Sequence, residues 1–139
     1  MDRYRLAPVR DARTRDEKSR RGDLAVAVGD ARATEDQVAA ALRRVEAARA
    51  AYEAARNTRE LATATQLSRA ELYARRKRRD LESAIVEHQR AEASHAGRLE
   101  AVDAARGQLA RARADREIVE RHFARWRDAR RKLAERRED

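Results

Sequence analysis

The feature that most constrains this chain is a spacing of seven residues between apolar side chains. From Leu24 to Tyr52 every seventh residue is apolar, and a second row of mostly small residues lies three positions further on. The first row contains Leu24, Ala31, Val38, Val45 and Tyr52, and the second contains Ala27, Thr34, Ala41, Ala48 and Ala55. Two such rows form the stripe by which one α-helix packs along another in a coiled coil.

A second stripe with the same spacing occupies the C-terminal half of the chain. One row runs through Leu81, His88, His95, Val102 and Leu109, is interrupted at Arg116 and resumes at Phe123. The row three positions further on contains Ala84, Ala91, Arg98, Ala105, Ala112, Val119, Trp126 and Leu133. Because each stripe must be buried against another surface, the two stripes predict that the chain folds back on itself.

A polar stretch with turn-forming residues separates the two stripes. Ser68 and Glu71 have the spacing of a capping box at a helix start, and Pro8 suits the first turn of a helix. The sequence therefore predicts an all-α fold, a long antiparallel two-helix coiled-coil hairpin that spans residues 1–139. We expect helix 1 over about 9–59, a loop over about 60–68 and helix 2 over about 69–137. At about 1.5 Å per residue, the second helix is longer by about 25–30 Å, which leaves an overhang after about Val119.

Composition excludes several classes of function. The chain has 139 residues and no cysteine, which rules out disulfides and thiolate metal sites. No apolar run approaches the roughly 20 residues of a membrane-spanning helix, so we expect a soluble, intracellular protein without direct membrane insertion. The sequence contains no glycine-rich phosphate loop and no HExxH pattern, and His88 and His95 are about 10 Å apart along one helix. We therefore expect no enzymatic activity, no cofactor and no metal site.

Positive charge is concentrated in particular segments. Residues 1–21 contain eight basic and four acidic side chains, and residues 121–137 contain eight basic and two acidic ones. These two segments are neighbours in a hairpin, so one end is strongly basic. A smaller cluster, Arg75 to Arg79, includes Lys77 on the predicted stripe. A specific nucleic-acid site would also need stacking aromatic residues or a groove-binding motif, and only Tyr73 lies nearby, so we expect no specific nucleic-acid partner.

An aromatic pair lies near the C-terminus, where helix 1 is not expected to reach. Phe123 and Trp126 are three residues apart and therefore share one helical face. Two interpretations are open: Tyr4 and Leu6 of the N-terminal segment cover the pair, or a partner protein does. Aromatic and arginine side chains are frequent anchors of protein interfaces. The nearby arginines that favour a partner include Arg127, Arg130 and Arg131.

Three segments of the chain are similar to one known family. They are the opening Tyr4-Arg-Leu-Ala-Pro-Val9, the segment Leu81-Glu-Ser-Ala-Ile-Val-Glu-His88, and the tryptophan- and arginine-rich end that begins Phe123-Ala-Arg-Trp126. Together with the chain length and the longer second helix, they resemble the central stalk proteins of the flagellar and virulence type III export ATPases, the FliJ/YscO family.

The resemblance implies a non-enzymatic stalk in the cytoplasm, at the base of the secretion apparatus, that couples a hexameric export ATPase to the export gate membrane protein. It implies export-gate binding at Leu81, Ala84 and His88. Lys77 occupies the position at which members of the family have an aromatic residue that belongs to the same site. It also implies that the paired termini enter the ATPase ring. The residues expected to bind the ring are Phe123, Trp126, Arg127, Arg130 and Arg131. Secretion chaperones are further expected partners.

Two other functions remain open from the residues alone. One is a basic helical hairpin that binds RNA or the ribosome, and the other is a dimeric coiled-coil scaffold or a secretion chaperone. The sequence also leaves two alternatives for the predicted export-gate residues. Leu81, Ala84 and His88 are also predicted stripe residues, so they face either helix 1 or a partner.

Overall fold

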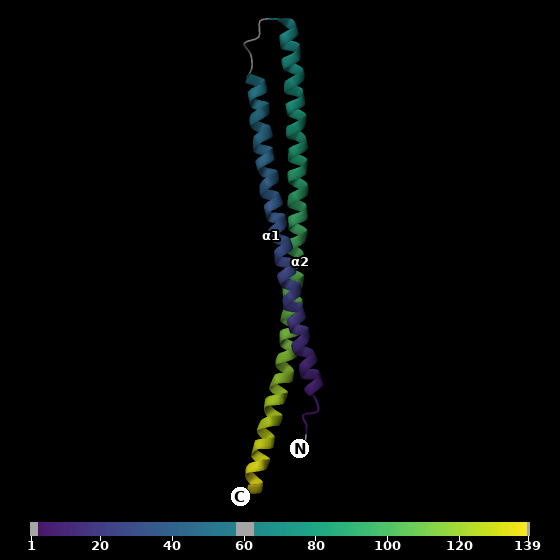
Figure 1. The fold of residues 1–139 in the computed structure, drawn as a ribbon, viewed down its shortest axis with the longest axis vertical. Helices are drawn as coiled ribbons and strands as arrows, with labels where there is room; N and C mark the ends of the chain where they lie inside the picture. Colours follow the sequence, from purple (N-terminus) through teal and green to yellow (C-terminus); the bar gives the residue numbers. More distant parts are fainter. Residues whose placement is uncertain (1–2, 58–62, 139) are drawn as a thin grey trace. The chain divides into compact units, whose positions relative to one another are not determined.

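The structure, a computed structural model, describes residues 3–57 and 63–138, and nearly all of them lie in two α-helices. Helix α1 spans Ala7–Asn57 and has 51 residues, whereas α2 spans Ala64–Glu138 and has 75. No strand occurs within these described ranges. Figure 1 shows the two helices joined as a hairpin. The predicted fold class, an all-α helical hairpin with a longer second helix, is confirmed.

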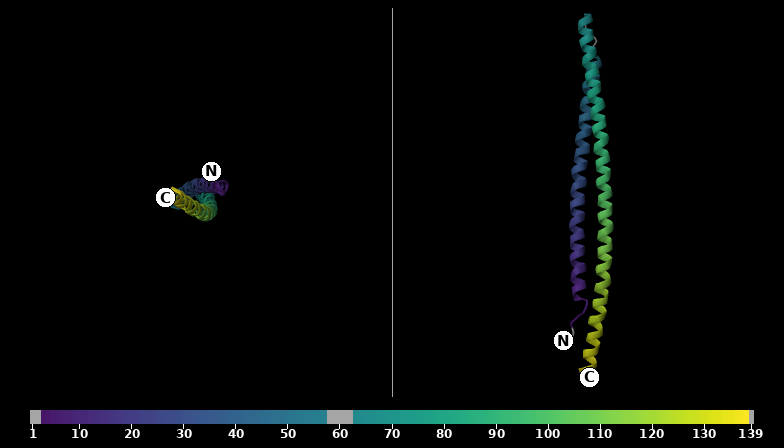
Figure 2. Two further views of the ribbon diagram at one scale, coloured as in Figure 1. Left: turned by 90° about the horizontal axis from the view of Figure 1, so that it is seen from below. Right: turned by 90° about the vertical axis from the view of Figure 1, so that its right-hand side faces the viewer.

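The hairpin divides into two compact units, each built from one segment of α1 and one segment of α2. Unit 1 consists of Met1–Val28 and Ala101–Asp139, and unit 2 of Gly29–Glu100. Within each unit the two segments lie side by side in the views of Figures 1 and 2. Each unit therefore has its own interface between α1 and α2.

The start of α2 differs from the prediction. The Thr63 backbone N–H donates to Gln66 Oε1 at 3.3 Å, and the Gln66 N–H donates to Thr63 Oγ1 at 3.2 Å. This reciprocal pair is a capping box, and it satisfies two N–H groups near the start of the helix five residues before the predicted one. The predicted loop over 60–68 is therefore wrong for residues 64–68, and exposed Ser68 lies inside α2. The rest of that loop, together with residues 58–59 of predicted helix 1, lies outside the described residues up to 62.

The interface of unit 2 follows the predicted stripe. Its buried side chains on α1 are small, and Ala41 is only 2% exposed. The buried residues are Ala31, Thr34, Ala41, Val45 and Ala55. Across the interface the Thr34 hydroxyl lies 2.9 Å from Nδ1 of His95. Because most of these side chains are small, the two backbones can approach closely along this unit.

One residue that the seven-residue spacing places in the interface of unit 2 is exposed instead. Arg98 is exposed, and its Nη1 lies 3.6 Å from Asp30 Oδ2 on α1. A guanidinium loses its hydration when it is buried without full hydrogen bonding, so the side chain stays at the edge of the interface. The prediction of a stripe position at Arg98 is wrong for this reason.

The interface of unit 1 has a short apolar part. Val102, Leu109 and Ala112 are buried on α2, and Leu24 and Ala27 of α1 are half-buried. The stripe ends before Leu133, which is 52% exposed. Between Ala112 and the chain end the contacts between the helices are mainly ionic and aromatic.

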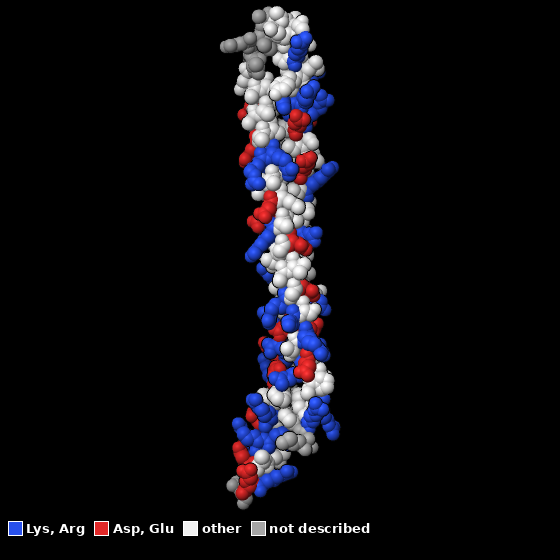
Figure 3. Space-filling model, viewed as in Figure 1, with Lys and Arg blue, Asp and Glu red and all other residues white. Residues whose placement is uncertain are grey.

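Charged side chains cover both helices. Figure 3 shows lysine and arginine side chains interspersed with carboxylates on the visible face, as expected when 42% of the residues are charged. Of the parts of the helices that the structure describes, none combines the length and the apolar character needed to cross a bilayer.

Candidate functional site

An aromatic cluster holds the N-terminal segment against α2 in unit 1. Tyr4 is 7% exposed, and its ring centroid lies 5.0 Å from that of Phe123 and 5.1 Å from that of Trp126. Its hydroxyl lies 2.9 Å from Nδ1 of His122. The interpretation that the N-terminal segment covers the aromatic pair is thus supported for Tyr4. Leu6 remains 38% exposed and covers less of it.

Arginine side chains lie over the faces of the same aromatic rings. The Arg10 guanidinium carbon is 4.2 Å from the Phe123 ring centroid, and that of Arg127 is 5.9 Å from it. The Arg130 guanidinium carbon lies 5.7 Å from the Trp126 centroid. A guanidinium placed in this way is attracted to the ring, and its N–H groups lie in its own plane. The cluster therefore combines apolar area with hydrogen-bond donors.

An open groove runs between the N-terminal segment and the last turns of α2. Its volume is about 820 Å³, and the exposed parts of Leu6 and Leu133 contribute to its wall. We call it the terminal groove. The residues that define it here are Arg3, Arg5, Leu6, Trp126, Arg130 and Leu133. Tyr4, His122 and Ala129 also line it, so three of its nine lining residues are arginines and the groove is both apolar and basic.

An ionic seam continues the contact between α1 and α2 next to the aromatic cluster. Arg10 Nε donates to Glu120 Oε1 at 2.6 Å, and Arg13 Nη1 donates to Asp115 Oδ2 at 3.3 Å. The Arg10 pair is about one-third exposed, so water weakens it only in part. The hydrogen bond from Arg10 lowers the pKa of Glu120, an effect that partial burial opposes.

Glu17 is the buried member of the ionic seam. Its side chain is 8% exposed and receives a hydrogen bond from Arg116 Nε. Arg21 Nη2 lies 3.0 Å away on the same helix, and Arg113 Nε lies 3.6 Å away on α2. Burial acts to raise the pKa of Glu17, but the hydrogen bond from Arg116 and the charges of these arginines together hold it below its ordinary value. The carboxylate therefore stays ionised although it is buried.

The ionic seam was missed at the level of sequence. The stripe was counted forward from Leu24, but the same count taken backward by sevens reaches Glu17 and Arg10. Arg116, treated as an interruption of the second stripe, is the residue that bonds Glu17. An acid on one stripe and an arginine on the other was the signal that could have revealed the pair.

The predicted overhang of α2 begins later than expected. Glu120 bonds Arg10, and Tyr4 extends the contact to Trp126, so the prediction of an unpaired segment from Val119 onward is wrong. The N-terminal segment before α1 supplies the extra contacts. The uncovered part of α2 consists of its last turns, which lie beyond the first residue of α1 in Figure 1.

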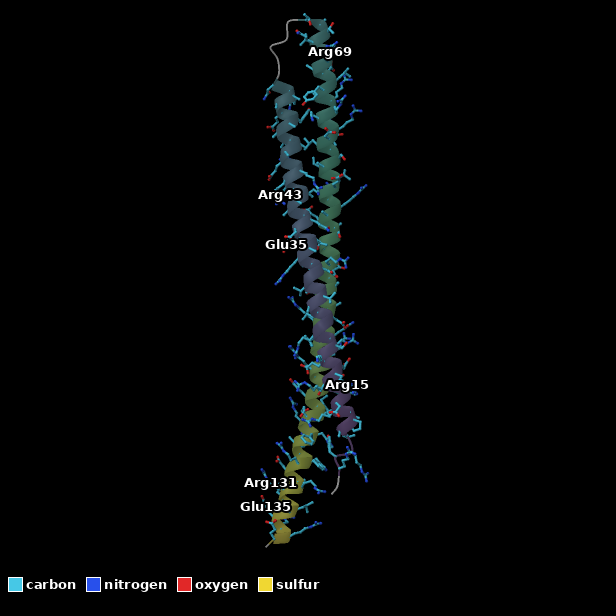
Figure 4. The ribbon with its side chains drawn as sticks, viewed as in Figure 1. Arg15, Glu35, Arg43, Arg69, Arg131 and Glu135 are labelled. Carbon is cyan, nitrogen blue, oxygen red and sulfur yellow. The ribbon has the colours of Figure 1, made fainter. Side chains whose placement is uncertain are left out.

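The predicted ATPase-ring residues lie together in unit 1. Phe123 and Trp126 are half-buried beneath Tyr4, Arg127 is exposed and Arg130 is half-buried. Arg131 is also exposed, and its Nε lies 3.9 Å from Glu135 Oε1 on the last turns of α2 (Figure 4). The structure thus brings the five residues to one end of unit 1, with the aromatic rings inside and the arginines around them.

The predicted export-gate residues lie on the half-buried face of α2 in unit 2. Lys77, Leu81, Ala84 and His88 are all half-buried, and the His88 side chain is 19% exposed. Leu81 and His88 precede His95 by two and one heptads, so they share the face with which His95 contacts Thr34 of α1. Lys77 lies beside this face, with Nζ 5.3 Å from the Tyr73 ring centroid. Leu81 and His88 therefore lie on the face of α2 that carries the contact of His95 with α1.

Within residues 3–57 and 63–138, no three histidine, aspartate or glutamate side chains converge on a point where they could hold a metal ion. Comparison of the chain with protein-family models, with curated proteins and with solved structures finds no match. The resemblance to the export stalk family therefore stays a prediction. The interpretation of the site rests on its residues and their geometry.

Proposed function

We propose that the chain is the non-enzymatic central stalk of a type III export apparatus, virulence-associated or flagellar. In this proposal it couples a hexameric export ATPase to the export gate membrane protein in the cytoplasm at the base of the apparatus. The observation that carries the proposal is the end of unit 1. There a longer helix continues past its partner and presents arginines around an aromatic cluster. A stalk needs such a marked end to engage a ring.

The hairpin itself also suits a mechanical role. Two long helices paired along both units transmit force better than a flexible chain. The ring contact is assigned to the arginines Arg127, Arg130 and Arg131, with Phe123 and Trp126 as the apolar support beneath them. Secretion chaperones are proposed as additional partners of the exposed helix faces.

The test is stimulation of the purified export ATPase from the same organism. Replacement of Arg127, Arg130 and Arg131 by glutamine should raise the half-saturating concentration of the chain by about five- to thirtyfold, because the three interface arginines together contribute about 1–2 kcal/mol. The matched control removes the same three charges from unit 2. It is Arg75→Gln, Arg78→Gln and Arg79→Gln, and it should leave the half-saturating concentration unchanged.

Equal stimulation by both triple variants would overturn the ring assignment. Recovery of ribosomal RNA instead of a hexameric ATPase from native cell extract would favour the basic RNA-binding hairpin. A stable dimer in sedimentation experiments, without either partner, would favour a coiled-coil scaffold. Each outcome selects one class of protein.

The export-gate contact at Lys77, Leu81, Ala84 and His88 needs a separate test, because all four residues are half-buried and Leu81 and His88 lie on the face of α2 that carries the His95 contact with Thr34. Leu81→Ala should lower the free energy of unfolding by about 1–2 kcal/mol, less than a fully buried leucine would. Val86→Ala, at a site that is 44% exposed, is the control. Loss of gate binding with unchanged stability would support a partner-facing role for Leu81. Loss of stability with normal gate binding would remove this site from the proposal.

A further inference from the structure

The first turns of α2 carry three large apolar side chains that the chain leaves exposed. Every residue from Thr63 to Arg69 is exposed, and Leu67 is 52% exposed. Leu72 and Tyr73 follow at 61% and 51% exposure. In Figure 1 the first turns of α2 extend past the end of α1 within unit 2. We call Leu67, Leu72 and Tyr73 the apolar layer. Single leucines scattered on a surface need no explanation, but exposed apolar residues gathered in one place indicate an interaction site.

A run of cations follows the apolar layer directly along the helix. We call this run the cationic layer, and it consists of Arg75, Arg76, Lys77, Arg78 and Arg79. Residues 63–79 contain six cationic side chains and one carboxylate, and Figure 3 shows mostly uncharged side chains at the start of α2 with blue ones after them. Arg76 and Arg79 are exposed and form no ion pair within residues 3–57 and 63–138, whereas the other three pair with carboxylates of the same helix at 2.6–3.9 Å. An anionic partner is the complement of this segment.

Both layers surround the helix instead of marking one face of it. Successive residues of an α-helix are rotated by about 100°, so Leu67, Leu72 and Tyr73 point in directions about 100–140° apart. Five consecutive cations likewise cover a full turn. A partner helix or a groove contacts only one face, with anchors that recur every three or four residues. Layers stacked along the helix axis suit a partner that is itself layered across that axis.

The surface of a lipid bilayer is layered in this way, with acyl chains inside and phosphates outside them. At about 1.5 Å per residue, the centre of the cationic layer lies about 9 Å along the axis from that of the apolar layer. Apolar residues of surface-bound helices lie about 5–10 Å into the boundary between headgroups and acyl chains. Arginines one layer further out therefore reach the phosphates. Tyrosine is favoured at this boundary, and the Tyr73 ring centroid lies 5.3 Å from Lys77 Nζ where the two layers meet.

The apolar layer also separates a lipid surface from a nucleic acid, which has phosphates too. Recognition of single-stranded nucleic acid depends on bases that stack on aromatic side chains. Leu67 and Leu72 offer no ring for stacking, and Tyr73 is the single aromatic residue of the layer. An RNA partner would leave the two leucines in water, whereas a lipid surface buries them.

We propose that the first turns of α2 bind the surface of an anionic membrane end-on. The apolar layer enters the boundary beneath the lipid phosphates, and the cationic layer pairs with those phosphates. The contact is made at the surface and needs no membrane-spanning helix. The proposal goes beyond the stalk function and does not depend on it, because it uses none of the residues assigned to the ring contact.

The test is sedimentation of the full chain with lipid vesicles. Vesicles of phosphatidylcholine alone are compared with a two-to-one mixture of phosphatidylcholine and phosphatidylglycerol. The partition coefficient should be at least about tenfold higher for the anionic mixture, because each cation near an anionic surface strengthens binding. Added salt should lower it. Equal binding to the two kinds of vesicle would overturn the proposal.

Paired variants test the apolar layer. Leu67→Ala combined with Leu72→Ala should lower the partition coefficient for the anionic vesicles by at least about tenfold, because both aliphatic side chains are shortened. The matched control is Val86→Ala combined with Leu99→Ala, at sites that are 44% and 48% exposed further along α2. It should bind as the original chain does. Equal binding by the two double variants would exclude a role for the apolar layer and contradict the proposal.

A second pair of variants separates the cationic layer from the net charge of the whole chain. Arg76→Gln combined with Arg79→Gln should lower the partition coefficient for the anionic vesicles by at least about tenfold. Arg90→Gln combined with Arg111→Gln removes the same charge from other exposed sites of α2 and should have little effect. All four residues are exposed, so the fold should not change. Equal losses would show that overall charge drives the binding, and the proposed site would be wrong.

The orientation can be measured because the chain has no cysteine. Ser68→Cys, Ser83→Cys and Ala134→Cys each introduce one site for an environment-sensitive fluorophore. Ser68 lies within the apolar layer, whereas Ser83 lies beyond the cationic layer. Only the label at position 68 should shift its emission to shorter wavelength on anionic vesicles. Equal shifts at 68 and 83 would refute the end-on contact, and a shift at 134 alone would move the contact to the other end of α2.

Competition with RNA decides between the two sources of phosphate. If a single-stranded RNA oligonucleotide displaces the vesicles, and only the arginine variant loses affinity for it, the site is a nucleic-acid site and the membrane proposal fails. No ATPase takes part in these measurements. Absence of vesicle binding with normal ATPase stimulation would remove only the membrane contact. Vesicle binding without ATPase stimulation would remove only the stalk assignment.

Discussion

Tyr4 allows the attachment of the N-terminal segment to α2 to be measured. Its hydroxyl is 2.9 Å from His122 Nδ1, and Tyr4→Phe removes this hydrogen bond without changing the ring. The net contribution of such a bond is about 0.5–1.5 kcal/mol. Because about 1.4 kcal/mol is a tenfold change in an equilibrium constant, the ratio of detached to attached segments should rise by about two- to thirteenfold.

The alanine variant extends the same argument to the rings. Tyr4→Ala also removes the contacts with Phe123 at 5.0 Å and with Trp126 at 5.1 Å. Each aromatic pair contributes about 0.5–1.5 kcal/mol beyond its buried area. The lower limits for the two pairs and the hydrogen bond already predict an increase of about tenfold or more in the detached population.

Acrylamide quenching of Trp126 measures this detachment, because the Tyr4 ring shields the indole. Quenching should increase from the original chain to Tyr4→Phe and again to Tyr4→Ala. Helix content by circular dichroism should stay constant, since Tyr4 precedes the first residue of α1. Tyr73→Ala, at a site that is 51% exposed in unit 2, is the control. Quenching of Tyr4→Ala equal to that of the original chain would refute the idea that Tyr4 covers Trp126.

Three further predictions concern the packing of the helices. Leu109 is 5% exposed, so Leu109→Ala should lower the free energy of unfolding in urea by about 2–3 kcal/mol, the low end for a buried leucine because two helices can shift to close the gap. Leu72→Ala, at a site that is 61% exposed, should change it by less than about 0.5 kcal/mol, and equal effects would contradict the interface. Gly97 lies inside α2 with no atom within 4 Å of an added Cβ, so Gly97→Ala should raise the same free energy by about 0.5–1 kcal/mol, and a decrease would contradict helical packing there. The pKa values of Glu17 and Glu120 are lower in the folded chain than their ordinary value of 4.5, so their stabilisation is complete above that pH and is lost as the pH falls through the lower folded-state pKa. In acid thermal melts Glu17→Gln should show a smaller loss of Tm below about pH 4.5 than the original chain, and an equal loss would exclude Glu17 as a source of the acid sensitivity.

The seven-residue spacing predicted the interface of unit 2 well. Ala31, Ala41 and Val45 are buried where the count placed them, because apolar side chains repeated every seven residues share the face with which one helix packs on another. The same reasoning predicted the hairpin, since a stripe on each helix has to be buried. The seven-residue period is sufficient to predict a helix interface wherever the burial of apolar side chains determines how the helices pack.

The start of α2 shows where local patterns stop being sufficient. Thr63 with Gln66 and Ser68 with Glu71 have the same capping-box spacing, and only the hydrogen bonds of the structure select the first. The pattern describes which residues can cap a helix, not which of two neighbouring candidates does so. When two capping boxes are possible and helix-forming residues follow the first, the helix can start at the first, as it does here.

The ionic seam and the aromatic cluster depended on information that a single stripe does not contain. Whether Glu17 meets Arg116 depends on the relative register of two helices, and a shift by one turn would pair it with another residue. Tyr4 lies before the helix and has no periodic partner, so the sequence offered its packing on Phe123 and Trp126 only as one of two interpretations. The charged and aromatic contacts of unit 1 were thus the part of the candidate site that the sequence could not predict in detail.

The two units join their helices by different contacts. Small apolar side chains dominate the interface of unit 2, whereas ion pairs contribute to that of unit 1, and this difference matters for binding. Separating the alanine contacts of unit 2 would expose apolar surface to water, which is unfavourable. A guanidinium of unit 1, in contrast, can exchange one carboxylate for another and remain hydrogen-bonded. Arg10 and Arg13 bond Glu120 and Asp115 across the interface with side chains that are one-third to one-half exposed. An acidic partner can therefore compete for these arginines without exposing buried apolar surface. Salt should weaken the ion pairs that join the helices in unit 1 for the same reason.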